Sequence, residues 1–470
     1  MRRKVSIIFL VFLLIQLPSN AILANQEFKI NANGHDIKLG KWLIIEEGTT
    51  YIPFSLVANL LDLGSSFDET NKSVTFQKGN TKLWVQASNK TVIINDIKIG
   101  IDKAPKMIHN TLYVPLKFTF DTLGVSVGWD EASNSVKINS SDIKNIDKPV
   151  KELLKEPLPA GYTQIQISAA GDCTLGFDDK FSKTNRFDSV LKEKGGDYSY
   201  FFKNVKHIFE MDDMTIVNLE NPLTNATSKA SKQFAFKGRP EYTQILKEGS
   251  VEAVNLSNNH TYDYKEQGMR DTITHLKNAN IIYFGNGNKA IKTIKGIKTA
   301  NLGYNGWSNN KNIKEQIKKD IVEMRKVADL VIVTFHWGIE RANYPNNIQK
   351  DLGRWAIDQG ADLVLGHHPH VMQGIEEYKG KQIVYSLANF CFGGNRNPAD
   401  KDTFIYQQSF TFNENKQLVA KRFNVIPCTV SSVNYRNDYC PTPQGGARGQ
   451  KIINRLKQYS SVFPKPAAIY

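Results

Sequence analysis

The stretch Ala361–Val371, A-D-L-V-L-G-H-H-P-H-V, joins an apolar run to three histidines that fall within four residues. The run Leu363–Leu365 predicts a short buried strand, which the following glycine ends, and Pro369 keeps the histidines in a loop. Ligands bind beyond the carboxyl ends of strands in α/β sheets. His368 and His370 are two residues apart, so both rings can leave the same side of an extended segment. Imidazole is a ligand of zinc, manganese and iron, so the stretch indicates either a metal site or a capping loop with surface histidines.

The chain around this stretch has 470 residues, which is too long for one hydrophobic core and predicts two or three domains. Its four cysteines form no C-x-x-C pair and show no zinc-finger spacing. Cys428 and Cys440 are close enough in sequence to form a disulfide outside the cell. Cys173 and Cys391 are instead expected to be small buried residues beside the site.

The N-terminus has the pattern of a secretory signal peptide. Residues 2–4 are basic, Val5–Leu17 is apolar, and small residues lead to Ala24. We therefore predict a signal peptide over residues 1–24, with an uncleaved membrane anchor as the alternative. Either reading places the protein in the secreted fraction, or on the extracellular face of the membrane or in the cell wall.

The chain is basic, with a formal net charge of +14, or +11 after the three signal-peptide charges are subtracted. A basic secreted protein favours polyanions such as wall polymers, an anionic capsule or lipid headgroups. The alternative is a soluble basic surface without a partner, since the lysines are scattered along the sequence. We expect no nucleic acid partner, because no basic-aromatic motif is present.

Residues 28–139 contain an internal repeat with an offset of 62 residues. Tyr51–Phe54 matches Tyr113–Leu116, and Phe67–Glu69 matches Trp129–Glu131. Each copy predicts a short strand, a helix and a hairpin around an Asp/Asn turn. Two such units can bury their helices and hairpins against each other, which predicts one small α+β domain.

The Y-[IV]-P, L-G and [FW]-D-E-x-x-x-S-V pattern of these copies resembles the copper amine oxidase N-terminal-type stalk domain of secreted bacterial proteins, over residues 28–140. Only His35 and His109 lie in this region, without clustered ligands, so the resemblance implies a spacer or wall-binding module rather than a copper site. Residues 141–161 are polar and contain prolines, which predicts a linker.

From Tyr162 onward, strand and helix patterns alternate, as is typical of a layered α/β sheet. Strands are predicted at 163–170, 214–219, 251–256, 281–284, 297–303, 330–335, 363–365 and 382–386. Helices are predicted at 198–210, 240–248, 265–278, 311–327 and 348–359, followed by antiparallel strands within 403–430 and a last helix at 448–459.

Polar residues follow these strands at the points where they end. They are Asp172, Glu220, the pair Asn259-His260 with Asp263, His336, His368 with His370, and Asn389. Each one alone could be a turn or capping residue. Together they supply the mixture of carboxylate, amide and imidazole groups that a metal centre needs, so we predict a metal site at one edge of the sheet.

The order of these motifs resembles the calcineurin-like metallophosphatases, whose pattern is D-x-H, G-D, G-N-H-[DE], a His and G-H-x-H. It is more similar to the capsule-synthesis protein CapA family, linked to poly-γ-glutamate capsules. The shared motifs here are G-D-C, V-N-L-E-N-P, S-N-N-H-T-Y-D, F-H-W-G-I-E, G-H-H-P-H-V and S-L-A-N-F. The resemblance implies a layered α/β/β/α metallophosphatase-like domain over residues 162–465.

The resemblance also implies roles for individual residues and a cofactor of one or two divalent ions of manganese, iron or zinc. His260, oriented by Asp263, would be a general acid, and Arg341 is one basic residue that could hold an anionic substrate. The implied ligands are Asp172 for the first metal, Glu220 in the bridging position, Asn259 and His336 for the second metal, and His368 and His370 with one ligand to each.

Two residues depart from the family pattern. Thr174 stands where D-x-H has its histidine, so the first metal would be weaker or absent, and the site mononuclear or non-catalytic. Ala388 replaces the usual glycine of the last motif, which matters only if this position needs a positive φ.

Three functions are compatible with these features. The first is a cell-surface protein of capsule or poly-γ-glutamate biosynthesis, with an anionic polymer and other capsule-synthesis membrane proteins as partners. The second is a secreted phosphatase or phosphodiesterase that acts on wall polymers or nucleotides. The third is a non-catalytic scaffold that binds the wall through residues 28–140.

Overall fold

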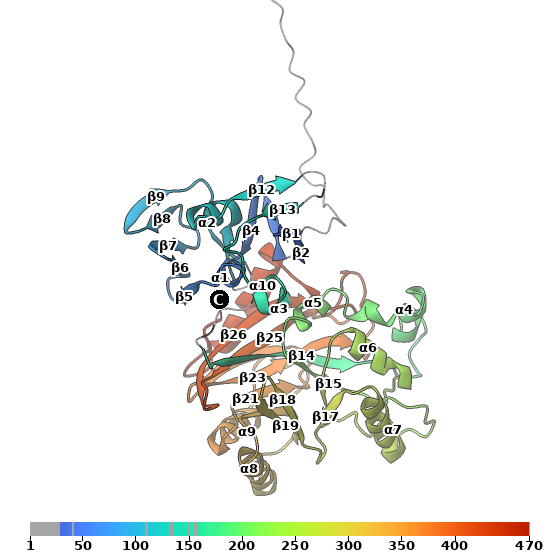
Figure 1. Ribbon diagram of the computed structural model, residues 1–470. Helices are drawn as coiled ribbons and strands as arrows, with labels where there is room; N and C mark the ends of the chain where they lie inside the picture. Colours follow the sequence, from blue (N-terminus) through green and yellow to red (C-terminus); the bar gives the residue numbers. More distant parts are fainter. Residues whose placement is uncertain are drawn as a thin grey trace, which may run out of the picture. The chain divides into compact units, whose positions relative to one another are not determined.

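The computed structural model describes residues 29–469, except 40, 41, 109, 110, 131, 132, 134, 149, 155–157 and 159. The predicted signal peptide, His109 and Glu131 therefore lie outside the described residues. The chain forms two compact units, Met1–Pro157 and Leu158–Tyr470 (Figure 1). In the described part of the chain, every helix is too short or too polar to cross a membrane.

The two repeats of the first unit fold alike. The first comprises β4 (Thr49–Pro53), α1 (Phe54–Leu60), β5 (Gly64–Asp68) and β6 (Ser73–Lys78), and the second β11 (Thr111–Pro115), α2 (Leu116–Thr122), β12 (Val127–Asp130) and β13 (Ser135–Ile138). Each helix begins directly after a proline, a residue that tolerates a helix start because it has no N–H to leave unpaired.

The two repeats pair with each other through β4 and β11. Tyr51 faces Pro115, Ile52 faces Val114 and Pro53 faces Tyr113 in an antiparallel register. The repeat offset of 62 residues carries Tyr51 to Tyr113 and Pro53 to Pro115. The register therefore maps onto itself, which makes this pairing a pseudo-twofold contact at the centre of the unit.

The remaining strands extend the first unit into three sheets. They are β1 (Lys29–Ala32), β2 (His35–Lys38), β3 (Ile44–Glu46), β7 (Thr81–Gln86), β8 (Thr91–Ile94), β9 (Ile97–Gly100) and β10 (Lys106–Ile108). The strand orders are β12-β13-β1-β2, β10-β11-β4-β3 and β5-β6-β7-β8-β9. One buried apolar cluster joins the unit, with α1 and α2 at its centre.

The interval 141–161, which we expected to be a linker, packs in part on the first unit. A short helix, α3 (Val150–Leu153), buries Leu153 completely. The Ser55 hydroxyl donates to the carbonyl oxygen of Leu154 over 2.7 Å, and the Asn59 amide donates to that of Leu153 over 2.9 Å.

The second unit contains two mixed sheets. The first has the order β17-β16-β15-β14-β25-β26-β27, with β24 also paired to β14. Its strands are β14 (Thr163–Thr174), β15 (Met214–Leu219), β16 (Ala253–Asn255), β17 (Ile282–Phe284), β24 (Asn389–Phe392), β25 (Asp402–Phe412), β26 (Leu418–Thr429) and β27 (Thr442–Pro443). The strands β14 to β17 are parallel, whereas β25 and β26 are antiparallel.

The second sheet has the order β18-β19-β20-β21-β23-β22. Its strands are β18 (Ala290–Ile294), β19 (Ile297–Gly306), β20 (Leu330–Trp337), β21 (Leu363–His367), β22 (Met372–Tyr378) and β23 (Lys381–Leu387). The four strands β19, β20, β21 and β23 are parallel, and β18 and β22 are antiparallel edge strands.

Helices accompany both sheets (Figure 1). Near the first sheet lie α4 (Phe187–Glu193), the 3₁₀ helices η2 (Tyr198–Phe201) and η3 (Pro240–Tyr242), α5 (Lys206–Phe209), α6 (Thr243–Glu248) and α7 (Lys265–Asn278). With the second sheet lie α8 (Lys311–Arg325) and α9 (Asn347–Gln359), while α10 (Gly446–Ser460) follows the last strands.

Alternate residues of a strand enter different cores, as the pleat requires. Ile216 of β15 and Ile332 of β20 belong to one cluster that draws on both sheets. Their neighbours point the other way: Val217 packs with residues of α6 and α7, and Val333 packs with residues of α8 and α9. Both sheets therefore bury two faces, which agrees with the near-continuous apolar runs of these strands.

The structure agrees with the predicted α/β unit and with the small α+β unit before it, and it shows that both sheets of the α/β unit are mixed. The predicted helix 198–210 is wrong as a single element, because it divides into η2 and α5. Tyr200, Phe201 and Phe202 are all buried, and three consecutive buried residues do not fit one face of a helix. The sequence patterns also missed α4, β18, β22 and β24.

The four cysteines are free and buried in the described structure, so the disulfide considered for Cys428 and Cys440 is not formed. The thiol of Cys440 instead contacts the carbonyl oxygen of Tyr200 at 3.3 Å, and burial raises its pKa to about 12. Cys173 and Cys391 are completely buried, as predicted.

Candidate metal centre

Strand ends of both sheets bring polar side chains together. In the first sheet, Asp172 of β14 faces Asn218 of β15, which in turn faces Asn255 of β16. In the second sheet, His336 of β20 faces His367 of β21. All five side chains are completely buried. Parallel strands end at the same edge of a sheet, and this is why residues far apart in sequence meet here.

Asp172 has polar neighbours on all sides. Its carboxylate accepts from the Asn218 side chain at 2.8 Å and from the backbone N–H of His368 at 3.2 Å. The Nδ1 atoms of His367 and His370 lie 3.4 and 3.3 Å from its oxygens. Burial acts to raise the pKa of Asp172, but the contacts with the two imidazoles outweigh it and hold the pKa well below its usual range.

Glu220 is completely buried, and neither of its carboxylate oxygens has a hydrogen-bond partner among the described residues. Its Oε1 atom lies 3.5 Å from Nε2 of His336 and 3.9 Å from Nε2 of His370. Burial, and then the charge of Asp172, raise the pKa of Glu220 well above its usual range. A buried carboxylate without a partner costs several kcal/mol, so this position favours a cation.

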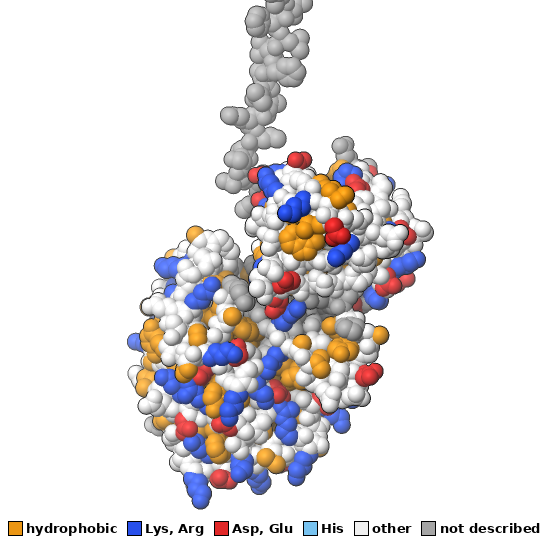
Figure 2. All heavy atoms as spheres, turned by 90° about the vertical axis from the view of Figure 1, so that its left-hand side faces the viewer, with side chains coloured by type: hydrophobic (Ala, Val, Ile, Leu, Met, Phe, Trp, Pro, Cys, Tyr) orange, Lys and Arg blue, Asp and Glu red, His pale blue; other side chains and the backbone are white. Residues whose placement is uncertain are grey.

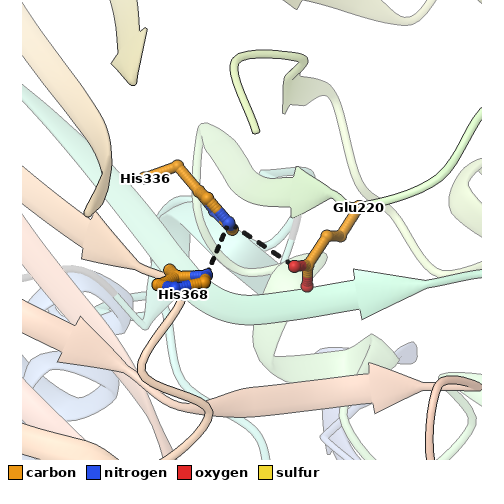
Figure 3. A group of neighbouring side chains, drawn as sticks. All are labelled: Glu220, His336 and His368. Carbon is orange, nitrogen blue, oxygen red and sulfur yellow. Dashed lines mark hydrogen bonds and ion pairs between the residues drawn. The ribbon is translucent and has the colours of Figure 1, made fainter. Parts of the chain in front are cut away.

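His336 connects the two sheets (Figure 3). Its Nε2 atom lies 3.1 Å from Nδ1 of His368 and 2.8 Å from Oδ1 of Asn259. Burial lowers the pKa of His336 well below its usual range, and burial together with the neighbouring His370 lowers that of His368 to about 4. Both rings are therefore neutral at pH 7, the form in which imidazole binds a metal.

His370 has the opposite electrostatic environment. Burial acts to lower its pKa, but the carboxylates of Glu220 and Asp172 outweigh this and raise the pKa to about 9. Its Nδ1 atom also lies 2.9 Å from Oδ1 of Asn389.

Three groups of side chains could each hold an ion, because their ligand atoms lie within 4.8 Å of one another. The groups are Asp172, Glu220 and His370; Glu220, His336 and His368; and Glu340, His368 and His370. The first two groups share Glu220, and two ligand groups joined by one carboxylate are the arrangement expected of a two-metal centre. Carboxylates combined with imidazoles fit a divalent cation such as manganese, iron or zinc.

The structure thus brings together all six residues predicted as metal ligands, with Asn259 reaching the group through His336. Their roles as ligands stay predictions. Thr174 is completely buried, and its hydroxyl oxygen has no hydrogen-bond partner in the described part of the chain. It therefore leaves the first group without the histidine of the metallophosphatase pattern.

The loops that carry the site adopt unusual backbone conformations. The φ angles are +96° at His368, +57° at His370 and +60° at Ala388. A non-glycine residue in such a region costs about 1–3 kcal/mol and persists only where its surroundings fix it. Ala388 thus occupies a position that needs a positive φ. At such a position, alanine in place of the family's glycine costs conformational free energy.

The predicted acid, His260, is held by Asp263. Nδ1 of His260 lies 2.6 Å from Oδ2 of Asp263, which is completely buried. The same carboxylate accepts from Nζ of Lys232 at 2.7 Å and from the backbone N–H of Phe236 at 2.6 Å. Burial lowers the pKa of His260, although Asp263 opposes the shift. Asp263 therefore orients the His260 imidazole, and the hydrogen bonds from Lys232 and Phe236 hold Asp263 in place.

Sequence reasoning missed four residues at this site. Asn218 and Glu340 belong to the N-L-E and H-W-G-x-E motifs, so a signal for them existed. Lys232 and Trp307 lie in loops without a motif. The exposed Trp307 ring packs edge-on against His368, with the ring centres 4.7 Å apart. The backbone of Arg341 is also near the centre, since its N–H donates to the carbonyl oxygen of Pro369 over 2.8 Å.

Comparisons with known proteins identify the family of the chain. The model of the family described as "Bacterial capsule synthesis protein PGA_cap" matches residues 166–394, and that of the "Copper amine oxidase N-terminal domain" matches residues 31–138. The PGA biosynthesis protein CapA of Bacillus subtilis (strain 168) is 35% identical over 321 residues, which cover 63% of this chain and 79% of that protein.

The capsule biosynthesis protein CapA of Bacillus anthracis is 33% identical over 256 residues, which cover 49% of this chain and 60% of that protein. Among solved structures, a 5'-nucleotidase from Candida albicans SC5314 is similar over 63% of this chain and 57% of that chain, with 12% identity and a TM-score of 0.33. The chain belongs to the bacterial capsule synthesis protein family. The resemblances to the capsule-synthesis protein family and to the copper amine oxidase N-terminal domain are thereby confirmed.

Proposed function

We propose that this protein acts in the synthesis of an anionic capsule polymer of the poly-γ-glutamate type, at the outer surface of the cell. Support comes from membership of the capsule synthesis family, and from relatives whose names refer to PGA and capsule biosynthesis. The proposal includes secretion through the segment 1–24, and the polymer and other capsule-synthesis membrane proteins as partners.

The chain's charge supports a polyanionic partner. Its net charge of +14 includes many lysines. In Figure 2, Lys and Arg side chains are scattered over the visible face of the larger unit rather than gathered in one stripe. A scattered distribution of this kind provides general attraction to an extended polyanion instead of a single high-affinity groove.

We further propose that the second unit is a four-layered α/β/β/α domain with a metal-dependent, phosphatase-like site. Support for the layers comes from the three apolar clusters, one shared by the two sheets and one on the helix side of each. A bound divalent cation supplies Lewis-acid activation of water and of an oxyanion substrate. Asp172, Glu220, Asn259, His336, His368 and His370 would hold one or two such ions.

The chain's own residues have two roles in this chemistry. His260 would give a proton to the leaving group, because Asp263 fixes its ring and leaves Nε2 available. Asp172, Glu220, His367 and His368 are buried, and burial would strengthen the electrostatic interaction of a cation held there with an anionic substrate.

One observation carries the proposal: the buried carboxylate of Glu220, shared by two ligand groups, has no hydrogen-bond partner among the described residues. Expression of this chain in a Bacillus subtilis strain that lacks its own CapA tests the biological part. We expect polymer production to be restored by the wild type and not by His368→Ala. No restoration by a wild-type chain that is expressed and exported would count against it.

A second candidate function is hydrolysis of phosphodiesters in wall polymers, which the His260–Asp263 pair favours. The test is hydrolysis of bis-p-nitrophenyl phosphate with added Mn²⁺ by the wild type, His260→Ala and a control variant, His275→Ala, on α7. Loss of activity in His260→Ala alone supports a phosphodiesterase. The absence of any metal-dependent hydrolysis by the wild type leaves the capsule function without this chemistry.

A further inference from the structure

Glu340 is a charged residue at the candidate metal centre that the family resemblance does not assign as a ligand. It is exposed, yet one of its carboxylate oxygens lies within 4.8 Å of a ring nitrogen of His368 and of a ring nitrogen of His370. These two histidines also belong to the two buried ligand groups. The three groups are therefore contiguous, with Glu340 on the solvent side.

The turn that carries Glu340 is fixed to the histidine loop. The N–H of Arg341 donates to the carbonyl oxygen of Pro369 over 2.8 Å, and Gln373 donates to the carbonyl oxygen of Ala342 over 2.8 Å. Arg341 has a φ of +63°. Two conformationally unusual segments therefore support each other, so that the position of Glu340 relative to His368 and His370 is set by the backbone.

The start of the same turn has no room for a side chain. Gly338 has a φ of +86°, and a Cβ there would lie 2.7 Å from the side chain of Gln349. Gln349 is itself held by the capping box of α9 with Asn346 and by a hydrogen bond of 2.8 Å to Gln373. The turn is therefore anchored at its start by Gln349, whereas Ile339, Glu340 and Arg341 are exposed.

Glu340 adds a carboxylate beside a ligand group that lacks one residue of the metallophosphatase pattern. Asp172, Glu220 and His370 make up that group, and the residue two after Asp172 is Thr174 rather than a histidine. Glu340 does not belong to this group, but the two share His370. A carboxylate suits a metal site because manganese and iron accept oxygen ligands together with imidazole.

We propose that Glu340 is an additional metal ligand, which together with His368 and His370 binds a divalent cation at the solvent side of the centre. This inference rests on the proposed metal site. It assigns the H-W-G-x-E glutamate a function that does not depend on whether the centre hydrolyses a phosphodiester.

Titration with Mn²⁺ alone, followed by calorimetry and by electron paramagnetic resonance, tests the assignment. Glu340→Gln keeps the shape of the side chain and removes its charge, and Glu340→Asp keeps the charge and shortens the reach. Glu315→Gln, an exposed residue on α8, is the matched control. We expect both Glu340 variants to bind Mn²⁺ at least about tenfold more weakly than the wild type, since even outer partners of a metal site contribute 10–100-fold.

The outcomes separate this inference from the proposed function. If the wild type and Glu340→Gln bind Mn²⁺ equally while His370→Ala does not, Glu340 is no ligand and the metal site stands. The assignment is also overturned if Glu340→Gln weakens Mn²⁺ binding only at low salt and Glu340→Asp does not weaken it. Long-range attraction by the carboxylate charge, which 1 M salt screens, would then explain the effect without direct coordination. If the wild type binds no Mn²⁺, the proposed metal site and the assignment of Glu340 both fail.

Discussion

The backbone N–H of Asp172 donates a hydrogen bond of 2.8 Å to the carbonyl oxygen of Ala388. The positive φ of Ala388 turns this carbonyl toward β14, where a Cβ on Gly171 would lie only 2.0 Å away from it. A strained alanine and an obligatory glycine thus position the first carboxylate of the candidate metal centre.

Ala388→Gly should stabilise the protein. A left-handed conformation costs a non-glycine residue about 1–2 kcal/mol, and the greater freedom of glycine in the unfolded chain takes back about 0.5–1 kcal/mol. We expect the free energy of unfolding to rise by up to about 1.5 kcal/mol in urea titrations. Ala300→Gly, in the buried strand β19, should instead destabilise the protein, and the same sign for both variants would contradict the strain at Ala388.

Asn218 should be one of the most sensitive positions outside the predicted ligands. Its side chain donates to Asp172 at 2.8 Å and accepts from Asn255 at 2.9 Å, all within the buried centre. Each buried group left unpaired costs about 1–3 kcal/mol, so Asn218→Ala should destabilise the metal-free protein by at least about 2 kcal/mol.

Asn301 offers a matched control for this experiment. It is also completely buried, but neither polar atom of its side chain has a hydrogen-bond partner among the described residues. Asn301→Ala should therefore cost less than Asn218→Ala in the same denaturant series. Equal losses would show that volume, and not hydrogen bonding, determines the effect at Asn218.

Metal binding should release protons. In the metal-free chain His370 holds a proton up to about pH 9, because the carboxylates of Glu220 and Asp172 outweigh its burial. A metal ligand must be neutral, so the apparent affinity should rise with pH below about 9, by about tenfold per pH unit for each proton displaced. Calorimetry in buffers of different ionisation enthalpy measures this number, and a value of zero at pH 7 would refute the protonated state of His370.

Four free thiols should be present without reductant. Each cysteine is buried, and Cys428 and Cys440 contact carbonyl oxygens rather than each other. A thiol reagent should therefore react slowly with the folded chain and count four thiols in denaturant. A count of two in denaturant would restore the disulfide that this structure lacks.

Much of the site could be predicted because its residues lie in short sequence patterns directly after predicted strands. An apolar run followed by Gly366 and two histidines specifies a strand, its end and the residues delivered there. The same is true of Asp172 after β14 and His336 at the end of β20. The alternation of strands and helices then places the strand ends of each sheet together. The predicted single sheet edge is wrong, because Asp172 and Glu220 lie at strand ends of one sheet, whereas His336 and His368 come from strands of another.

The parts that were missed depend on contacts between separate elements. Glu340 reaches the centre only because the backbone of Arg341 pairs with Pro369, and Lys232 reaches Asp263 across a long loop. Helix 198–210 failed for a related reason, because the tertiary core accepts three consecutive aromatic residues that a single helix could not bury. No local pattern contains this information.

The metal content of the purified protein tests the central claim most directly. Elemental analysis should give up to two divalent ions per chain for the wild type and fewer for Asp172→Ala and His368→Ala. The loss should be larger in His368→Ala, because His368 belongs to two ligand groups. A wild type that holds no more metal than the two variants would contradict the account.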